Sequence, residues 1–252
     1  MKTFSLTQGK LAYVSKGKKN PTFLLVHNSG GNHEMMNELA SHLSKRGKVL
    51  IPDLLGHGAS DSPKIEYTVK FFAESLIKLC SHENCNQIIY IGLHYGACIG
   101  IEIAKIAPLL ISHLILLDPT IFMEPWVVNV VEQVIEKLKN PPEGWEEETI
   151  SSAILKASND NREIALRALK LTPIFVRAST FTNLLAWDKN HNFICPIPTL
   201  IIQGSQPFCK EEKVRKVFSN LQVGRVVGSG LWPTIEVPAQ IHSMIDRFLE
   251  IY

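Results

Sequence analysis

A histidine flanked by two glycines is the residue of this chain best placed to do chemistry. His94 is the centre of Gly92-Leu93-His94-Tyr95-Gly96, which follows an apolar run and precedes a stretch with helical spacing. Glycines at this spacing permit a sharp strand-to-helix turn, here called the elbow, that lifts the central side chain above a sheet. A helix start disfavours a cationic ring, so we interpret His94 as a candidate general base or weak nucleophile.

Four further segments stand in a fixed order around the elbow. They are His27-Asn28-Ser29-Gly30-Gly31, residues 53–61, residues 198–204 and residues 228–238. Together with the elbow they resemble the landmarks of the α/β-hydrolase family, and the resemblance covers essentially the whole chain. It implies the α/β-hydrolase fold, in which a mostly parallel central sheet has helices on both faces and carries a helical cap insertion.

The same resemblance implies a nucleophile, an acid and a histidine, and this chain departs from all three. His94 takes the place of the nucleophile, Leu231 that of the histidine, and Gln206 or Pro207 that of the acid. A hydroxyl nucleophile needs a base, and the base needs an orienting carboxylate. Leu231 can neither accept nor donate a proton. We therefore predict a degenerate triad that has lost the Ser-His-Asp mechanism.

Two parts of such a site could survive these replacements. The resemblance places oxyanion-hole donors at the backbone N–H groups of Ser29 and Tyr95, next to Asn28 and Gly30. Backbone donors do not depend on side chains, so an anion or a carbonyl oxygen could still bind there. Some family members carry their acid after the strand that follows the elbow, which makes Asp118 a candidate partner of the elbow imidazole.

Each candidate also has a structural interpretation. His94 could merely line a pocket, and Asp118 could only accept backbone N–H bonds. His27 and His57 lie in loops where the family uses histidine structurally. Arg177 is predicted to form a surface ion pair, with an anionic ligand as the alternative. Because no His or Cys spacing suits a metal and no nucleotide loop is present, we expect neither a metal nor another cofactor.

Apolar runs and helical patterns alternate along both ends of the chain, as expected for a parallel sheet. From about residue 120 the strands stop and helical patterns take over. We therefore predict a core of residues 1–119 and 193–252 and a cap of residues 120–192. The predicted strands cover 22–26, 49–51, 87–91, 113–117, 199–202 and 225–227, and the predicted core helices cover 33–46, 67–80, 97–106, 210–219 and 239–251.

Composition narrows the classes of function. Of 252 residues, 45% are hydrophobic and 20% are charged, and the formal net charge is +2. This balance gives no reason to expect nucleic-acid binding. No apolar stretch reaches the roughly 20 residues of a membrane-spanning helix, and the N-terminus has no apolar signal region. Five cysteines without a C-x-x-C pair favour free thiols, so we expect a cytoplasmic protein that binds no membrane.

Two kinds of function fit these observations. The first is binding of a small, partly apolar ester, acyl or carbonyl compound under the cap, extended to turnover if His94 supports a non-standard mechanism. Such an enzyme would be an ester or acyl hydrolase, or a lyase. The alternative is a catalytically inactive pseudoenzyme that acts as a protein-interaction scaffold or receptor. The sequence indicates no oligomeric state.

Overall fold

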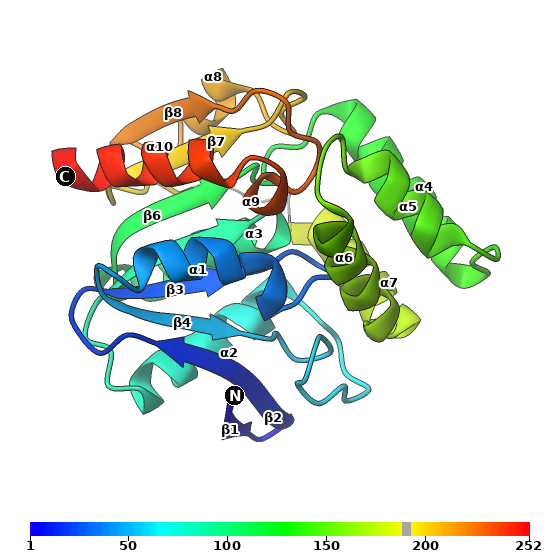
Figure 1. The fold of residues 1–252 in the computed structure, drawn as a ribbon, viewed down its shortest axis with the longest axis horizontal. Helices are drawn as coiled ribbons and strands as arrows, with labels where there is room; N and C mark the ends of the chain where they lie inside the picture. Colours follow the sequence, from blue (N-terminus) through cyan, green and yellow to red (C-terminus); the bar gives the residue numbers. More distant parts are fainter. Residues whose placement is uncertain (188–192) are drawn as a thin grey trace.

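An eight-stranded sheet forms the centre of the computed structural model, which describes residues 1–187 and 193–252 (Figure 1). The strand order is β1-β2-β4-β3-β5-β6-β7-β8, in which β2 pairs antiparallel with β1 and β4 and all other neighbours are parallel. The strands are β1 (Lys2–Leu6), β2 (Gly9–Lys16), β3 (Thr22–Val26), β4 (Lys48–Pro52), β5 (Ile88–Leu93), β6 (Ile111–Leu117), β7 (Thr199–Gln203) and β8 (Leu221–Arg225). The mostly parallel sheet expected from the sequence is therefore confirmed.

Helices cover both faces of this sheet. On one face α2 packs against α3, and on the other α1 packs against α10 (Figure 1). The helices of the core are α1 (Asn37–Leu43), α2 (Val69–His82), α3 (Tyr95–Ile106), α8 (Glu211–Val214), α9 (Pro233–Glu236) and α10 (Pro238–Ile251), with 3-10 turns η1 (His33–Met36) and η2 (Pro108–Leu110). This layering buries the central strands from both sides.

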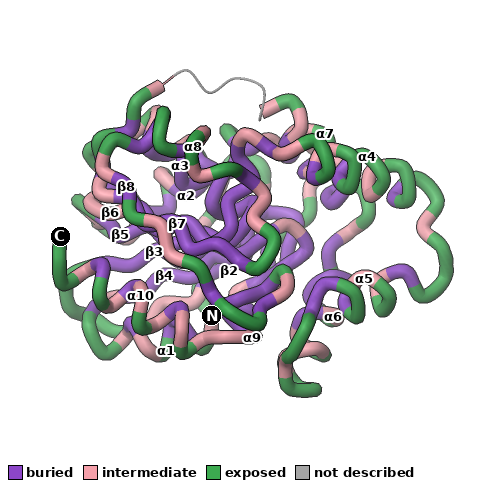
Figure 2. Tube along the Cα trace, turned by 90° about the horizontal axis from the view of Figure 1, so that it is seen from above, coloured by how far each residue is buried: buried purple, intermediate pink, exposed green. Residues whose placement is uncertain are grey.

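A separate apolar core fills each side of the sheet. In β3, Leu24 and Val26 join the core next to α2 and α3, while Phe23 and Leu25 join the core next to α1 and α10. Successive side chains of a strand point to opposite faces, so a strand covered on both sides must be apolar throughout. Figure 2 shows the central strands as buried and much of α1 and α10 as exposed or intermediate. Continuous apolar runs therefore identified these strands correctly.

The sequence predictions failed at the edges of the sheet. The hairpin of β1 and β2 was not predicted, and the last strand is β8 rather than residues 225–227. An edge strand has less of its surface covered, so its apolar residues alternate with polar ones: Leu221 is buried and Gln222 is exposed. The helix predicted over 210–219 ends early, at Val214, since Phe218 forms a β-bridge with Cys195 that needs extended backbone.

In the described part of the segment between β6 and β7, four helices lie beyond the carboxyl ends of the parallel strands (Figure 1). These cap helices are α4 (Pro125–Lys139), α5 (Trp145–Ala153), α6 (Asn159–Leu171) and α7 (Ile174–Trp187). They agree with the helical pattern expected after residue 120, although residues 188–192 lie outside the described part of the chain. The division into a core domain and a cap domain stays a prediction.

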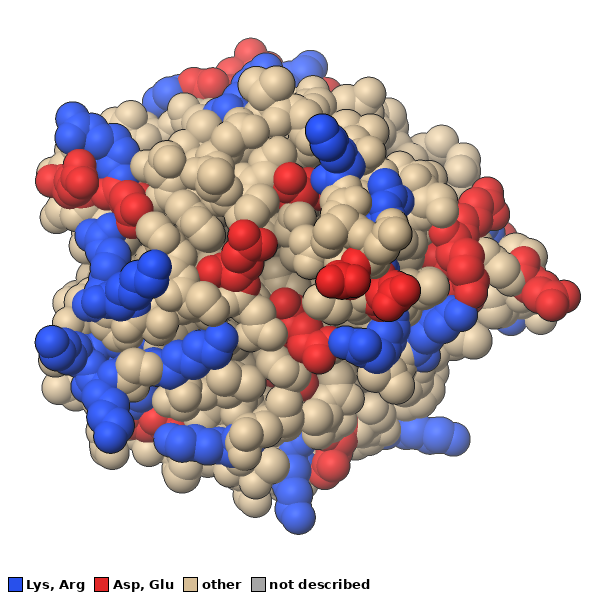
Figure 3. Space-filling model, viewed as in Figure 1, with Lys and Arg blue, Asp and Glu red and all other residues tan. Residues whose placement is uncertain are grey.

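Charged side chains of both signs are spread over the face drawn in Figure 3, and basic ones are more frequent along its lower left edge. Within the described ranges, no helix is both long and apolar enough to cross a bilayer. The same residues contain no group of three or more His, Cys, Asp and Glu side chains that could hold a metal ion.

In open α/β sheets, ligands bind outside the carboxyl ends of the strands. In this protein that position is the space between the elbow and the cap helices.

Candidate ligand-binding and active site

His94 occupies a sharp turn between β5 and α3. Its φ of 47° and ψ of −105° lie outside the helix and strand regions, a strained conformation for a residue with a side chain. Two glycines make this turn sterically feasible. A Cβ on Gly92 would lie 2.4 Å from the carbonyl oxygen of Gly96, and a Cβ on Gly96 would lie 2.4 Å from that of Val26. The expected glycine-flanked elbow is therefore present, with His94 at its apex.

Replacing Gly96 by alanine should destabilise the fold strongly, because the new methyl group would overlap the main-chain oxygens of Val26 and His27. We expect the free energy of unfolding, measured by urea titration, to fall by about 3 kcal/mol or more. Gly144→Ala is the matched control. Gly144 has a φ of +74° but no atom within 4 Å of the added Cβ, so only backbone strain of about 1 kcal/mol applies. Equal losses in the two variants would contradict this reading of the elbow.

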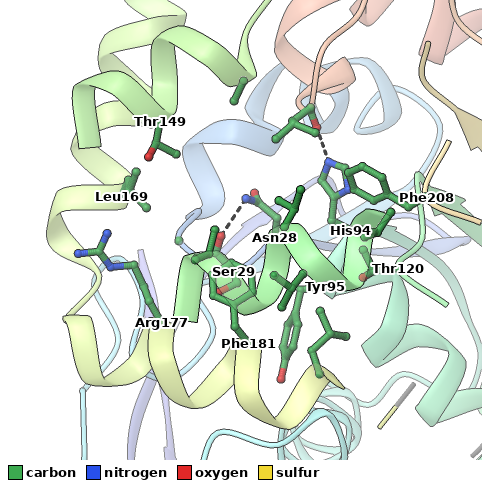
Figure 4. Close-up of a pocket in the computed structure, with 18 of the residues that line it drawn as sticks. Asn28, Ser29, His94, Tyr95, Thr120, Thr149, Leu169, Arg177, Phe181 and Phe208 are labelled. Carbon is green, nitrogen blue, oxygen red and sulfur yellow. Dashed lines mark hydrogen bonds between the residues drawn. The ribbon is translucent and has the colours of Figure 1, made fainter. Parts of the chain in front are cut away.

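Both ring nitrogens of His94 face main-chain carbonyl oxygens. Nδ1 lies 3.0 Å from the oxygen of Asp118, and Nε2 contacts that of Leu231, drawn as the dashed line at His94 in Figure 4. Carbonyl oxygens only accept hydrogen bonds, so both contacts are hydrogen bonds only when both nitrogens carry a proton. The ring centroid of Phe208 lies 5.1 Å from that of His94. In this conformation the imidazole presents no lone pair to the cavity.

The carboxylate of Asp118 is bound to a different partner. Its Oδ2 accepts the backbone N–H of Gly204 at 3.0 Å. Burial raises the pKa of Asp118, against the opposing effects of His94 and of the Gly204 and Phe208 amides. The structure thus brings Asp118 beside His94, but the contact between them runs through the main-chain carbonyl and not through the carboxylate. This geometry favours the structural interpretation of Asp118.

The residues expected to form an oxyanion hole lie on one wall of a cavity. Asn28, Ser29, Gly30 and Tyr95 all line it. Within the described chain, the backbone N–H groups of Ser29 and Tyr95 have no hydrogen-bond partner. The Ser29 hydroxyl lies 2.7 Å from the Thr180 hydroxyl of α7, which ties this loop to the cap helices. Neither amide is engaged by a described residue, and their role as an oxyanion hole stays a prediction.

The positions predicted from the sequence to be replaced members of a triad differ in where they lie. Leu231 lines the cavity, whereas Gln206 is exposed and Pro207 half-buried, and neither is among the described lining residues. Phe208, from the same loop, lines the cavity instead, with its ring centroid 5.8 Å from that of Trp126. The sequence analysis missed Phe208. The one signal that could have indicated it is a large apolar residue next to Gln206 and Pro207, the positions predicted for the acid.

A cavity of about 250 Å³ separates the elbow from the cap helices (Figure 4). Trp126 and Val130 lie on its wall and are 44% and 47% exposed, so they mark a side open to solvent. Deeper side chains from the cap helices are apolar and include Val127, Val131, Trp145, Leu169, Phe181 and Leu184. A concave apolar wall with a few polar groups is the usual form of a small-molecule site.

Arg177 is not a surface residue, so that prediction is wrong. Its side chain is 3% exposed and belongs to the cavity wall. The ion pair itself exists: Nη2 donates to Oε1 of Glu146 at 2.8 Å, and the guanidinium carbon lies 5.2 Å from the ring centroid of Trp145. No described residue hydrogen-bonds to Nε or Nη1 of Arg177. The helical pattern of α7 could not indicate this burial, because the packing of α5 against it is a tertiary contact.

Histidines hold the loops that flank the elbow. The ring of His27 accepts the N–H of Leu54 at 3.1 Å, and Asp53 accepts the backbone N–H of His33 at 2.7 Å. Burial lowers the pKa of His27, and burial together with His27 lowers the pKa of His57 to about 3. Neutral, fully buried rings of this kind agree with the structural roles expected for His27 and His57.

Fold and elbow together define the class of protein. Residues 21–208 match the model of the alpha/beta hydrolase fold family, and the chain belongs to this family. A Haemophilus influenzae protein provisionally named an esterase/lipase is 26% identical, over 97% of this chain and 88% of its own length.

Two solved structures show the same fold. A thermophilic esterase from Thermogutta terrifontis, with malate bound, has a TM-score of 0.84 and 20% identity over 99% of this chain and 98% of its own. A Bacillus megaterium epoxide hydrolase in complex with an inhibitor has a TM-score of 0.82 and 15% identity over 99% and 100%. At these identities the likeness concerns the fold, which hosts several chemistries.

Proposed function

We propose that this protein binds a small, largely apolar ester, acyl or carbonyl compound in the cavity, and that it does not hydrolyse it by serine chemistry. One observation carries the proposal: the elbow residue, His94, has both ring nitrogens against main-chain carbonyls, while the cavity beside it is open. The esterase/lipase name of the Haemophilus influenzae relative supports the substrate class.

Binding follows from the composition of the cavity wall. Burial of a ligand's apolar body against Val131, Phe181 and Leu184 contributes about 25 cal/mol for each Å² removed from water. A carbonyl oxygen of the ligand would accept hydrogen bonds from the Ser29 and Tyr95 amides, which have no partner within the described residues. These two donors orient the ligand, because the apolar walls give it no direction.

Catalysis by His94 would require a different conformation. The segment around Leu231 would have to withdraw so that Nε2 gained a free lone pair, and Phe208 would have to leave room beside the ring. Only then could the imidazole act as a general base. A pure protein-interaction scaffold is the other alternative, and it would have no use for the cavity. Binding without turnover therefore fits the observed geometry best.

Wild-type protein should not hydrolyse p-nitrophenyl esters from acetate to decanoate, and His94→Ala should match it. Methyl esters of the same acids should nevertheless give a saturable change in tryptophan fluorescence, because Trp126, Trp145 and Trp232 line the cavity. Val131→Trp, which fills the cavity, should abolish the saturable change. Ester turnover that disappears in His94→Ala would establish a histidine-centred enzyme, and the absence of any saturable signal would favour the scaffold.

A further inference from the structure

Two cysteines lie side by side where α2 ends. Cys80 belongs to the last turn of this helix, and Cys85 lies in the loop that follows it. Asn84 has a left-handed φ of 55°, and its N–H donates to the carbonyl oxygen of Ser81 at 3.1 Å. The N–H of Cys85 donates to the carbonyl oxygen of Cys80 at 2.8 Å. These bonds form a Schellman motif, which brings the side chains at the positions of Cys80 and Cys85 into contact.

The spacing of this pair suits a disulfide bond. With an N···O distance of 2.8 Å, standard bond lengths keep the Cα atoms of Cys80 and Cys85 within about 6.7 Å of each other. Disulfides usually join Cα atoms that are between roughly 4.4 and 6.8 Å apart. The two thiols are also hydrogen-bonded to each other. An S–S bond could therefore form without a rearrangement of the main chain.

The two thiols differ in exposure and in their surroundings. All five cysteines belong to the described residues, and Cys85 is half-buried whereas the other four are buried. A hydrogen bond with Cys80 lowers the pKa of Cys85. The ammonium of Lys48 and the hydroxyl of Thr22 lower it further, against the effects of burial and of Glu83. The hydrogen bond with Cys85, together with burial, raises the pKa of Cys80. Because the thiolate is the reactive form of cysteine, Cys85 is the nucleophile of the pair.

We infer that Cys80 and Cys85 form a redox site, which hydroperoxides oxidise to a reversible disulfide within the chain. The Cys85 thiolate attacks a peroxide oxygen, so that an S–O bond forms, the O–O bond breaks and the leaving oxygen takes up a proton from water. The Cys80 sulfur then displaces hydroxide from the Cys85 sulfenic acid, and the Cys80 proton leaves with it as water. The two thiols lose two electrons, which reduce the peroxide, and a dithiol reductant reverses the change.

This redox site lies at the opposite end of β5 from the elbow. Cys85 precedes the six-residue strand and His94 follows it, which corresponds to a separation of about 20 Å along the strand. Oxidation of the pair is therefore independent of the proposed ligand-binding function.

Hydrogen peroxide at pH 7.5, with the oxidised residues mapped by mass spectrometry, tests the redox site. In wild-type protein the Cys80–Cys85 disulfide should form at least about tenfold faster than any other cysteine is oxidised, and dithiothreitol should restore both thiols. Cys85→Ser should abolish this fast reaction. Cys195→Ser is the matched control and should leave it unchanged, because Cys195 is buried and burial raises its pKa.

Two further variants separate the roles of the groups around Cys85. Cys80→Ala should accumulate a Cys85 sulfenic acid that dimedone traps, because the thiol that displaces hydroxide is gone. Lys48→Met should slow disulfide formation several-fold, since less Cys85 is ionised, whereas Lys48→Arg keeps the positive charge and should react like wild type. Equal oxidation rates of all five cysteines, or a wild-type protein that retains the Cys85 sulfenic acid without forming the disulfide, would overturn the redox site.

Discussion

Serine at position 94 and histidine at position 231 should convert the protein from a binder into an ester hydrolase. His94→Ser places a hydroxyl at the apex of the elbow and removes the ring that contacts the Leu231 carbonyl. Leu231→His supplies a base on the cavity wall, at the position predicted from the sequence for the histidine of the triad. If the Ser29 and Tyr95 amides, which no described residue engages, form the predicted oxyanion hole, all parts of acyl transfer would be present except the acid.

Asp118 is the better native candidate for that acid. It is buried beside the elbow, whereas Gln206 is exposed and does not line the cavity. We therefore expect the double variant to be active without a third change, and Gln206→Asp to add little. Asp118→Asn in the double variant should lower turnover about 100-fold or more, because the amide cannot stabilise an imidazolium. The amide oxygen can still accept the Gly204 N–H, so the fold should be kept.

The measurement is turnover of p-nitrophenyl butyrate, with melting temperature recorded for every variant. We expect at least about a 100-fold gain for the double variant over wild type, since nucleophile and base are both restored. If the folded double variant shows no turnover while the variant that also carries Gln206→Asp is active, residue 206 is the position of the acid. Silence of both would mean that the Ser29 and Tyr95 amides do not form a working oxyanion hole.

The fold could be predicted from the sequence because its signals are local. A strand such as β3 is apolar at every residue since both its faces are covered, and Gly92 and Gly96 are required by contacts within the elbow. The β1–β2 hairpin escaped the same reasoning, because partly covered edge strands mix polar and apolar residues. The predictions were therefore correct for the central strands of the sheet and wrong for its edge strands.

The position of the candidate site could be predicted from the sequence, but the contacts that its side chains make could not. The position of His94 follows from neighbouring glycines, whereas its contact with Leu231 joins residues 137 positions apart. Likewise the helical pattern around Arg177 does not indicate its burial, which involves tertiary contacts with Trp145 and Glu146. Such long-range contacts decide whether an imidazole has free nitrogens and whether a charged side chain is exposed or buried.

Mild acid should destabilise the protein through His57. The pKa of this histidine is lowered to about 3 by burial and by His27, whereas in the unfolded chain it is about 6.5. Between these values the unfolded state binds the proton and the folded state does not, so stability is fully present above about pH 6.5. It is lost as pH falls towards 3, by about 1.4 kcal/mol for each pH unit over the middle of this window.

Urea titrations at pH 7.5, 6.5, 5.5 and 4.5 would separate His57 from the other titrating groups. His57→Leu removes the titrating ring, so the difference in unfolding free energy between wild type and variant should shrink steadily as pH falls. Leu79→Ala, a buried truncation on α2, is the control and should give a difference that does not change with pH. A constant difference for His57→Leu as well would mean that the pKa of the ring is the same in the folded and the unfolded protein. Because His57 contacts the ring of Phe72 and lies beside His27, its protonation would disturb the loops next to the elbow, and ligand affinity should decline over the same pH range.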